Sequence, residues 1–135
     1  MSKDKTKEEI TDINPEDYKK EYVAKAGQPL PEGSKKASRE ALIEALKTVS
    51  DPEIMVNIWD MGLVYKLEQK ENGDVYIEMT VTSPMCPVAG VLPEQAAQAV
   101  SLVEGVGEVE VRIVWEPAWS FEMLSDEAKA MFELL

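Results

Sequence analysis

The sequence predicts an α+β fold: a two-layer α/β sandwich in which helices cover one face of a mixed three-stranded sheet. Three segments alternate apolar and polar residues with a period of two, which is typical of strands with one buried face. Three others repeat apolar residues every three or four positions, which is typical of amphipathic helices. Along the chain these segments follow the order helix, strand, strand, helix, strand, helix.

The first helix and a hairpin occupy the start of this pattern. A helix is expected over residues 38–49, with Ser38 as its N-cap. Strands over residues 63–70 and 75–81 flank Asn72-Gly73, a dipeptide typical of a two-residue hairpin turn because it tolerates positive φ. The two strands should therefore pair in antiparallel fashion.

The second half of the pattern begins with a helix over residues 88–103, which Pro93 should bend because proline removes a backbone donor. A strand over residues 108–115 follows. It should pair in parallel with the second strand of the hairpin, because one crossover helix joins the two. Ser125 can cap a last short helix, in which Ala128 and Met131 are expected to be buried.

Charge divides the 135 residues into two regions. Residues 1–37 hold eight lysines and eight acidic residues, whereas residues 38–135 hold six basic and eighteen acidic residues. The first region has too few large apolar side chains to offset its ordering entropy. We expect a charged, mostly disordered extension over residues 1–37, with one short helix over residues 14–27 as the alternative, and one folded domain over residues 38–135.

Composition excludes several classes of function. The net charge of −12 is opposite to that of a nucleic-acid-binding protein and disfavours anionic membranes. The first residues lack a signal-peptide pattern, so a cytoplasmic protein is expected. With one cysteine and no histidine, the chain has no intrachain disulfide and no imidazole base or ligand. The composition therefore argues against a conventional enzyme.

Cys86 is the first candidate for chemistry. It precedes Pro87 at the expected start of a helix, where unpaired N–H groups lower a thiol pKa. Without a base or a second cysteine, metal ligation is the chemistry that fits. An iron–sulfur cluster needs about four thiolates, so one chain can offer only one of them. The alternative is that Cys86 is a small buried residue of the core.

Two further features lie in loops. Asp51 and Glu53 flank a proline after the first helix, where they either end the helix or supply carboxylates to the Cys86 loop. Antiparallel pairing places residues 60–62 beside residues 82–84, so these loops should form one site. Trp119 lies in a proline turn and either anchors a partner or packs over the edge of the core.

Three segments together resemble the SufT/PaaD-like family, the metal–sulfur cluster biosynthetic domain. The resemblance covers residues 38–135. The segments are Asp51-Pro52-Glu53-Ile54-Met55-Val56-Asn57-Ile58 with Asp60-Met61-Gly62-Leu63-Val64-Tyr65, Thr80-Val81-Thr82-Ser83-Pro84-Met85-Cys86-Pro87, and Val114-Trp115-Glu116-Pro117-Ala118-Trp119-Ser120.

The resemblance implies an accessory factor of iron–sulfur cluster assembly, not an enzyme, that helps to pass clusters from a scaffold or carrier protein to client apo-proteins. It places the reactive cysteine at Cys86 and the acidic motif at Asp51 and Glu53. No tightly bound cofactor is expected, only a transient cluster or metal shared through Cys86. Contacts with partners are expected at four further residues: Thr82, Pro84, Pro87 and Trp119.

Two other functions stay open, and so does the oligomeric state. The chain can be a protein-interaction adaptor with a structural cysteine. It can also be an accessory of an oxygenase pathway, as in the PaaD branch, although the chain ends at Leu135 without the additional cysteines of that branch. A homodimer is also open, because a thin sheet leaves one face or edge available for another chain.

Overall fold

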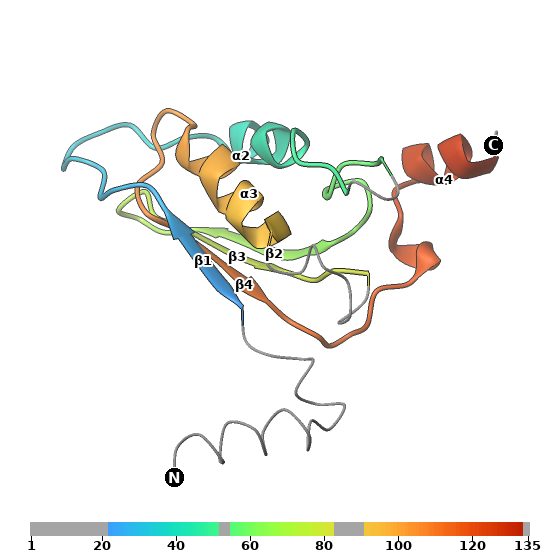
Figure 1. Ribbon diagram of the computed structural model, residues 1–135. Coiled ribbons are helices and arrows are strands. Elements are labelled where there is room, and N and C mark those ends of the chain that lie inside the picture. The colour runs from blue at the N-terminus through green and yellow to red at the C-terminus, as the bar shows by residue number, and fades with distance from the viewer. Residues whose placement is uncertain (1–21, 52–54, 83–90, 134–135) are drawn as a thin grey trace, which may run out of the picture.

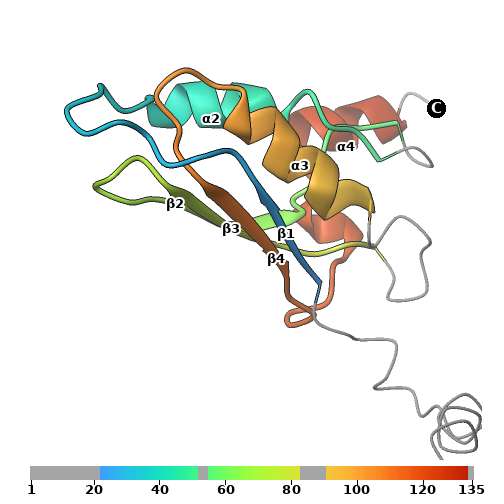
Figure 2. The ribbon, with the colours of Figure 1, turned by 60° about the vertical axis from the view of Figure 1, so that its left-hand side comes forward.

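The computed structural model describes residues 22–51, 55–82 and 91–133. In this part of the chain, two helices lie over one face of a four-stranded sheet, and a third lies beyond one end of them on the same side (Figures 1 and 2). No helix of the described residues is long and apolar enough to cross a membrane. The elements are β1 (Val23–Ala26), α2 (Arg39–Leu46), β2 (Val64–Gln69), β3 (Val75–Met79), α3 (Val91–Ser101), β4 (Val109–Ile113), the short 3-10 helix η3 (Phe121–Met123) and α4 (Asp126–Glu133).

The strands lie in the order β1-β4-β3-β2. β2 and β3 form the predicted antiparallel hairpin, and β3 pairs in parallel with β4 after the crossover through α3. Both pairings agree with the prediction, because a short turn permits only antiparallel neighbours and a crossover helix returns the chain in the same direction.

The prediction of three strands is wrong, because β1 pairs antiparallel with β4 and forms a fourth. It comes from the segment expected to be mostly disordered, and its four residues Val-Ala-Lys-Ala are too few and too small to signal a strand on their own. The strand is stabilised by its partner: Ala24 is buried, and the pairing satisfies backbone groups along an edge of β4. A helix over residues 14–27 is excluded for residues 23–26, and the boundary after residue 37 stays a prediction.

The core lies between the sheet and the helices α2 and α3. Most side chains predicted to face inward on the strands are buried, as is the apolar face of α2 and of α3, whereas Tyr65 and Trp115, also predicted to face inward, are only partly buried. Pro93 is the third residue of α3, in the first turn, where its missing N–H would have had no helical partner. The fully buried side chains of the core include Leu42, Leu46, Val75, Ile77, Met79, Leu92, Val100, Val109 and Val111.

Two helix ends follow the capping prediction, and one burial prediction fails. The Oγ of Ser38 accepts from the N–H of Ala41 at 3.2 Å, and the Oγ of Ser125 accepts from the N–H of Ala128 at 3.1 Å. Ala128 is buried as expected. Met131, however, is 56% exposed, because α4 lies at the end of the sheet and packs only one narrow side against the domain.

The hairpin turn is longer than predicted. The N–H of Lys70 donates to the carbonyl of Asp74, so three residues separate this pair. Among them only Gly73 has positive φ, at +94°. This is the pattern of a three-residue hairpin loop, in which one left-handed glycine follows a type I turn.

The sheet face opposite the helices carries a balanced set of charges. Lys66 Nζ lies 3.9 Å from Glu68 Oε2, and Arg112 Nη2 lies 3.5 Å from Glu110 Oε2. Tyr76 donates its hydroxyl hydrogen to Glu78 at 2.8 Å. The strong acidity of residues 38–135 therefore resides mainly outside this face.

Tyr76 should make the fold sensitive to alkaline pH. Burial, then its hydrogen bond to Glu78 and the charges of Glu78, Glu110 and Glu68, raise the pKa of Tyr76 from 10.0 to about 12. The folded state retains the phenol proton that the unfolded state loses first, so the stability from this group is complete below about pH 10 and is lost as the pH rises toward about 12. A tyrosinate absorbance titration should show this late ionisation, and Tyr76→Phe should remove it. An unchanged titration of the variant would contradict the assignment.

Candidate functional site

Three of the predicted site residues are described: Asp51, Thr82 and Trp119. The other four, Glu53, Pro84, Cys86 and Pro87, lie outside the described residues. The juxtaposition of Cys86 with the two acids therefore stays a prediction, and the site is built here from the residues on either side of it.

Asp51 lies in a tight loop after α2 and is only 1% exposed. Its N–H donates to the carbonyl of Val56 at 3.0 Å, and its carbonyl accepts from the N–H of Met55 at 2.7 Å. Met55 has φ of +67° and a side chain that is 76% exposed. In the part of the chain that the structure describes, every buried side-chain nitrogen and oxygen atom has a hydrogen-bond partner. Asp51 is thus an inner anchor of this loop, and Met55 is its exposed side.

A second turn leads from this loop into β2. The amide of Asn57 donates to the carboxylate of Asp60 at 2.8 Å, and the N–H of Asp60 donates back to Asn57 Oδ1 at 2.8 Å. At the start of β2 the carbonyl of Leu63 accepts from the N–H of Thr80 at 2.8 Å. The two strand ends are therefore neighbours, as antiparallel pairing predicted, and Thr82 follows two residues later.

The C-terminal strap, residues 116–125, crosses the start of β2. Trp119 is half-buried, and its Nε1–H donates to the carbonyl of Met61 at 2.6 Å. Tyr65 donates its hydroxyl hydrogen to the carbonyl of Pro117 at 2.7 Å, and the N–H of Ser125 donates to the carbonyl of Asp60 at 2.7 Å. Trp119 therefore packs over the edge of the core, which is one of the two roles expected for it.

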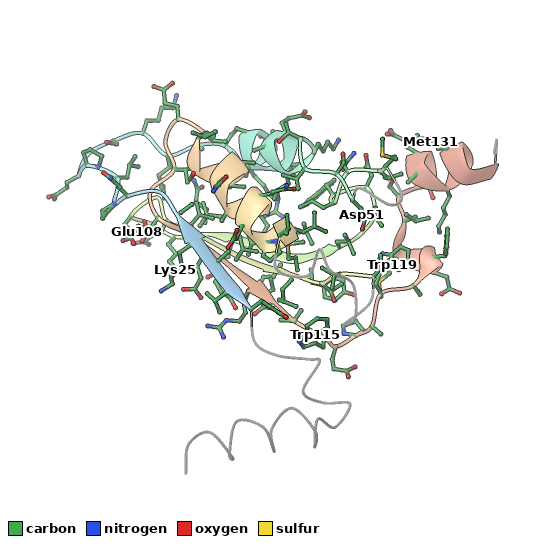
Figure 3. All side chains as sticks on the ribbon, viewed as in Figure 1. Lys25, Asp51, Glu108, Trp115, Trp119 and Met131 are labelled. Atoms are coloured by element: carbon green, nitrogen blue, oxygen red, sulfur yellow. The ribbon has the colours of Figure 1, made fainter. Side chains whose placement is uncertain are left out.

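Asp51 and Trp119 lie toward the same end of the molecule, the end at which α4 is found (Figure 3). Large apolar side chains are exposed in the loop and in the strap: Met55 at 76% and Phe121 at 59%. The rings of Trp119 and Phe121 are 5.6 Å apart between centroids. This end therefore combines a buried acid with accessible apolar groups, which suits contact with another protein.

Two features of this end were missed from the sequence. Gly62 has φ of +75°, and an added Cβ would lie 2.2 Å from the carbonyl oxygen of Met123. Tyr65 holds the strap through Pro117, and burial raises the pKa of Tyr65. The glycine was visible in the sequence, but nothing there showed that residue 123 would approach it.

Replacing Trp119 with phenylalanine should cost about 1–2 kcal/mol of unfolding free energy. An aromatic ring remains, but it is smaller than the indole, and the carbonyl of Met61 loses its donor in a buried place. Urea unfolding measures the loss. Phe121→Leu, a change at a mostly exposed ring on the same strap, should cost about 0.5 kcal/mol or less. Equal losses for the two variants would contradict the anchoring role of the Trp119 hydrogen bond.

Metal ligands are scarce in this chain. The whole sequence has one cysteine and no histidine. Within residues 22–51, 55–82 and 91–133, no three acidic, cysteine or histidine side chains are grouped so that they could hold a metal ion. Thiolate ligation by one chain therefore rests on Cys86.

Comparison with known proteins gives one family. The model described as "Iron-sulfur cluster assembly protein" matches residues 39–111, slightly more than half of the chain. The "Fe-S protein maturation auxiliary factor" of Porphyromonas gingivalis is 40% identical over 97 residues, which cover 72% of this chain and 90% of that protein. The "Fe-S protein maturation auxiliary factor SufT" of Staphylococcus aureus is 36% identical over 81 residues, 60% of this chain and 92% of that protein.

Among solved structures, the crystal structure of a domain of unknown function, DUF59, from Bacillus anthracis has the same fold. It superposes with a TM-score of 0.68 at 39% identity, and the match covers 71% of this chain and 92% of that chain. The matched relatives are therefore covered over about nine-tenths of their length.

Proposed function

The chain belongs to the iron–sulfur cluster assembly protein family, and from that premise we propose how it takes part in the maturation of iron–sulfur proteins. It assists the transfer of a cluster from a scaffold or carrier protein to client apo-proteins, and it acts as an accessory factor, not as an enzyme. The observation that carries this proposal is the match to maturation factors over nearly their whole length, in a chain with one cysteine and no histidine.

The single thiol sets the chemistry of the proposed step. A cluster needs about four thiolates or equivalent ligands, so a chain with one must share the cluster with a protein that supplies the rest. Cys86 replaces one ligand of the cargo cluster for as long as the two proteins are in contact. A lone ligand dissociates easily once the client offers its own thiolates, which suits transfer better than storage.

The residues on either side of the Cys86 loop support placing this loop near the start of β2. The chain leaves the sheet after β3 at Thr82 and re-enters the described structure at Val91, the first residue of α3. The end of β3 adjoins the start of β2, on which Trp119 is anchored. In the proposal, Asp51 and Glu53 flank the thiol, and Thr82, Pro84, Pro87 and Trp119 contact the partner.

Cluster transfer can be followed anaerobically by visible circular dichroism and by the recovered activity of a client enzyme. A cluster-loaded carrier and an apo-client are mixed with and without the chain at substoichiometric amounts. The proposal predicts faster transfer with the chain and no cluster retained by it afterwards. An unchanged transfer rate would contradict the transfer role.

A further inference from the structure

Helix α4 has an apolar face that the rest of the described chain covers only in its first turn. Ala128 is 1% exposed, whereas Met131, three residues later, is 56% exposed. Residues three apart in a helix are neighbours on its surface, so the face that begins in the core continues beyond the domain. This part of α4 is therefore available to another protein.

Two more exposed apolar side chains lie near the start of α4. Phe121 belongs to η3 and is 59% exposed, and Met55, in the loop after α2, is 76% exposed. Figures 1 and 2 both show this loop beside α4. The N–H of Ser125, which caps α4, donates to the carbonyl of Asp60 at 2.7 Å and joins the helix to the turn that follows the loop. We call Met55, Phe121 and Met131 the apolar patch.

The contacts behind the apolar patch hold it in place before a partner binds. The N–H of Met55 donates to the carbonyl of Asp51 at 2.7 Å. The ring of Phe121 lies 5.6 Å from that of Trp119, which is itself bonded to the carbonyl of Met61. A surface ordered in advance loses less entropy on binding, so more of the contact energy remains as affinity.

The exposed charges that follow the chain through the apolar patch are mainly negative. Between Phe121 and Met131 the chain has three acidic residues and one lysine, all exposed: Glu122, Asp126, Glu127 and Lys129. Within the described ranges, none of the three acids forms an ion pair, whereas Glu68 and Glu110 on the open sheet face do. Acids in the first turn of α4 also favour its dipole, but Glu122 lies outside that helix. This end therefore attracts a basic protein surface and repels an acidic one.

We propose that the apolar patch and its three acids dock a cluster carrier protein whose own surface presents apolar side chains surrounded by lysine or arginine. Complementary charges speed the encounter and set its orientation, and the apolar side chains supply most of the affinity once water is excluded. A fixed charge pattern selects one partner better than a range of clients, which favours the carrier. The identity of the partner rests on the proposed function, whereas the chemistry required of its surface rests on the patch.

Calorimetric titration of the Cys86→Ser chain with the cluster-loaded carrier measures docking without ligand exchange at the thiol. In this background Met131→Ser should raise the dissociation constant at least about fivefold, because an exposed anchor is lost. Leu102→Ser is the matched control and should leave the constant unchanged: Leu102 is 85% exposed and follows α3 at its end away from α4 (Figure 1). Equal effects of the two changes, or no binding by the Cys86→Ser chain, would overturn the proposal.

Charge reversal and salt test the electrostatic part of the proposal. Glu122→Lys in the same background should weaken docking about two- to fivefold at low salt, and the difference should disappear at about 0.5 M salt, because exposed charges are screened. Glu108→Lys is the matched control, since the exposed Glu108 lies at the opposite end of the molecule from Met131 (Figure 3). Equal weakening by the two reversals, or weakening by Glu122→Lys that persists at high salt, would overturn the charge complementarity.

The same variants separate this proposal from the role in cluster transfer. Docking that responds to Met131→Ser as expected, with no acceleration of transfer by the parent chain, would contradict the transfer role alone. Acceleration of transfer that Met131→Ser and Glu122→Lys leave unchanged, when made in the parent chain, would contradict the docking surface alone.

Discussion

Replacing Cys86 with serine should abolish the acceleration of cluster transfer that the chain provides. Serine has nearly the same size, but its hydroxyl does not ionise near neutral pH and its oxygen is a hard ligand, whereas iron–sulfur clusters are held by soft thiolates. Because the sequence has no second cysteine and no histidine, no other thiolate or imidazole can take its place as a ligand. The transfer rate with the variant should fall to the rate measured without the chain.

The control for this variant is a measurement of its stability and secondary structure. Cys86→Ser should keep the melting temperature and the far-ultraviolet spectrum of the parent chain, and Cys86→Ala should give the same loss of transfer. A serine variant that still accelerates transfer would contradict the ligand role of Cys86. A variant that loses both transfer and stability would instead place the thiol in the core, which is the structural role that the sequence left open.

The second large effect is expected at Gly62. An alanine there has to adopt φ of +75° and place its Cβ 2.2 Å from the carbonyl oxygen of Met123, so the strap has to move away from β2. We expect a loss of about 3 kcal/mol of unfolding free energy, from backbone strain and from weakened contacts of the strap.

Gly33 provides the matched control for Gly62→Ala. Its φ is +85°, but nothing lies within 4 Å of an added Cβ. Gly33→Ala should therefore cost only the backbone strain, about 1 kcal/mol. Urea unfolding of both variants separates strain from the clash with the strap. Equal losses of unfolding free energy in the two variants would contradict a contribution from the clash between residue 62 and Met123.

Much of the fold could be predicted because its signals are local. Alternation over residues 63–81 and the dipeptide Asn72-Gly73 specify a hairpin within a few residues, and the helix between β3 and β4 requires a parallel pair. β1 was missed because its signal is not local: Val-Ala-Lys-Ala becomes a strand only when the edge of β4 is present. Met131 was assigned to the core because helical periodicity alone does not say how far a sheet extends beneath the helix.

The candidate site could be predicted in part. The chain order of the strands brought Leu63 beside Thr80, and this follows from antiparallel pairing alone. The contacts of the strap could not be found in this way, because Trp119 with Met61 and Tyr65 with Pro117 join residues more than fifty positions apart. Such contacts depend on where a turn directs the chain, and no periodicity records that direction.

The composition also limits what this fold can do alone. A chain that offers one thiol cannot close a cluster site, so the proposed transfer role requires a second protein that supplies the remaining ligands. Exposed Met55 and Phe121, in the loop after Asp51 and in the strap, give that protein adaptable apolar groups to contact. Partner recognition and ligand exchange are then expected at one end of the molecule.

The reactivity of Cys86 toward iodoacetamide tests this account most directly, with the native chain alone, with the apo-carrier and with the cluster-loaded carrier. The account predicts rapid alkylation of the chain alone, no change with the apo-carrier, and strong protection when the carrier holds its cluster. Alkylation that occurs only after the chain is denatured would contradict it, because a thiol buried in the core cannot bind iron that another protein holds.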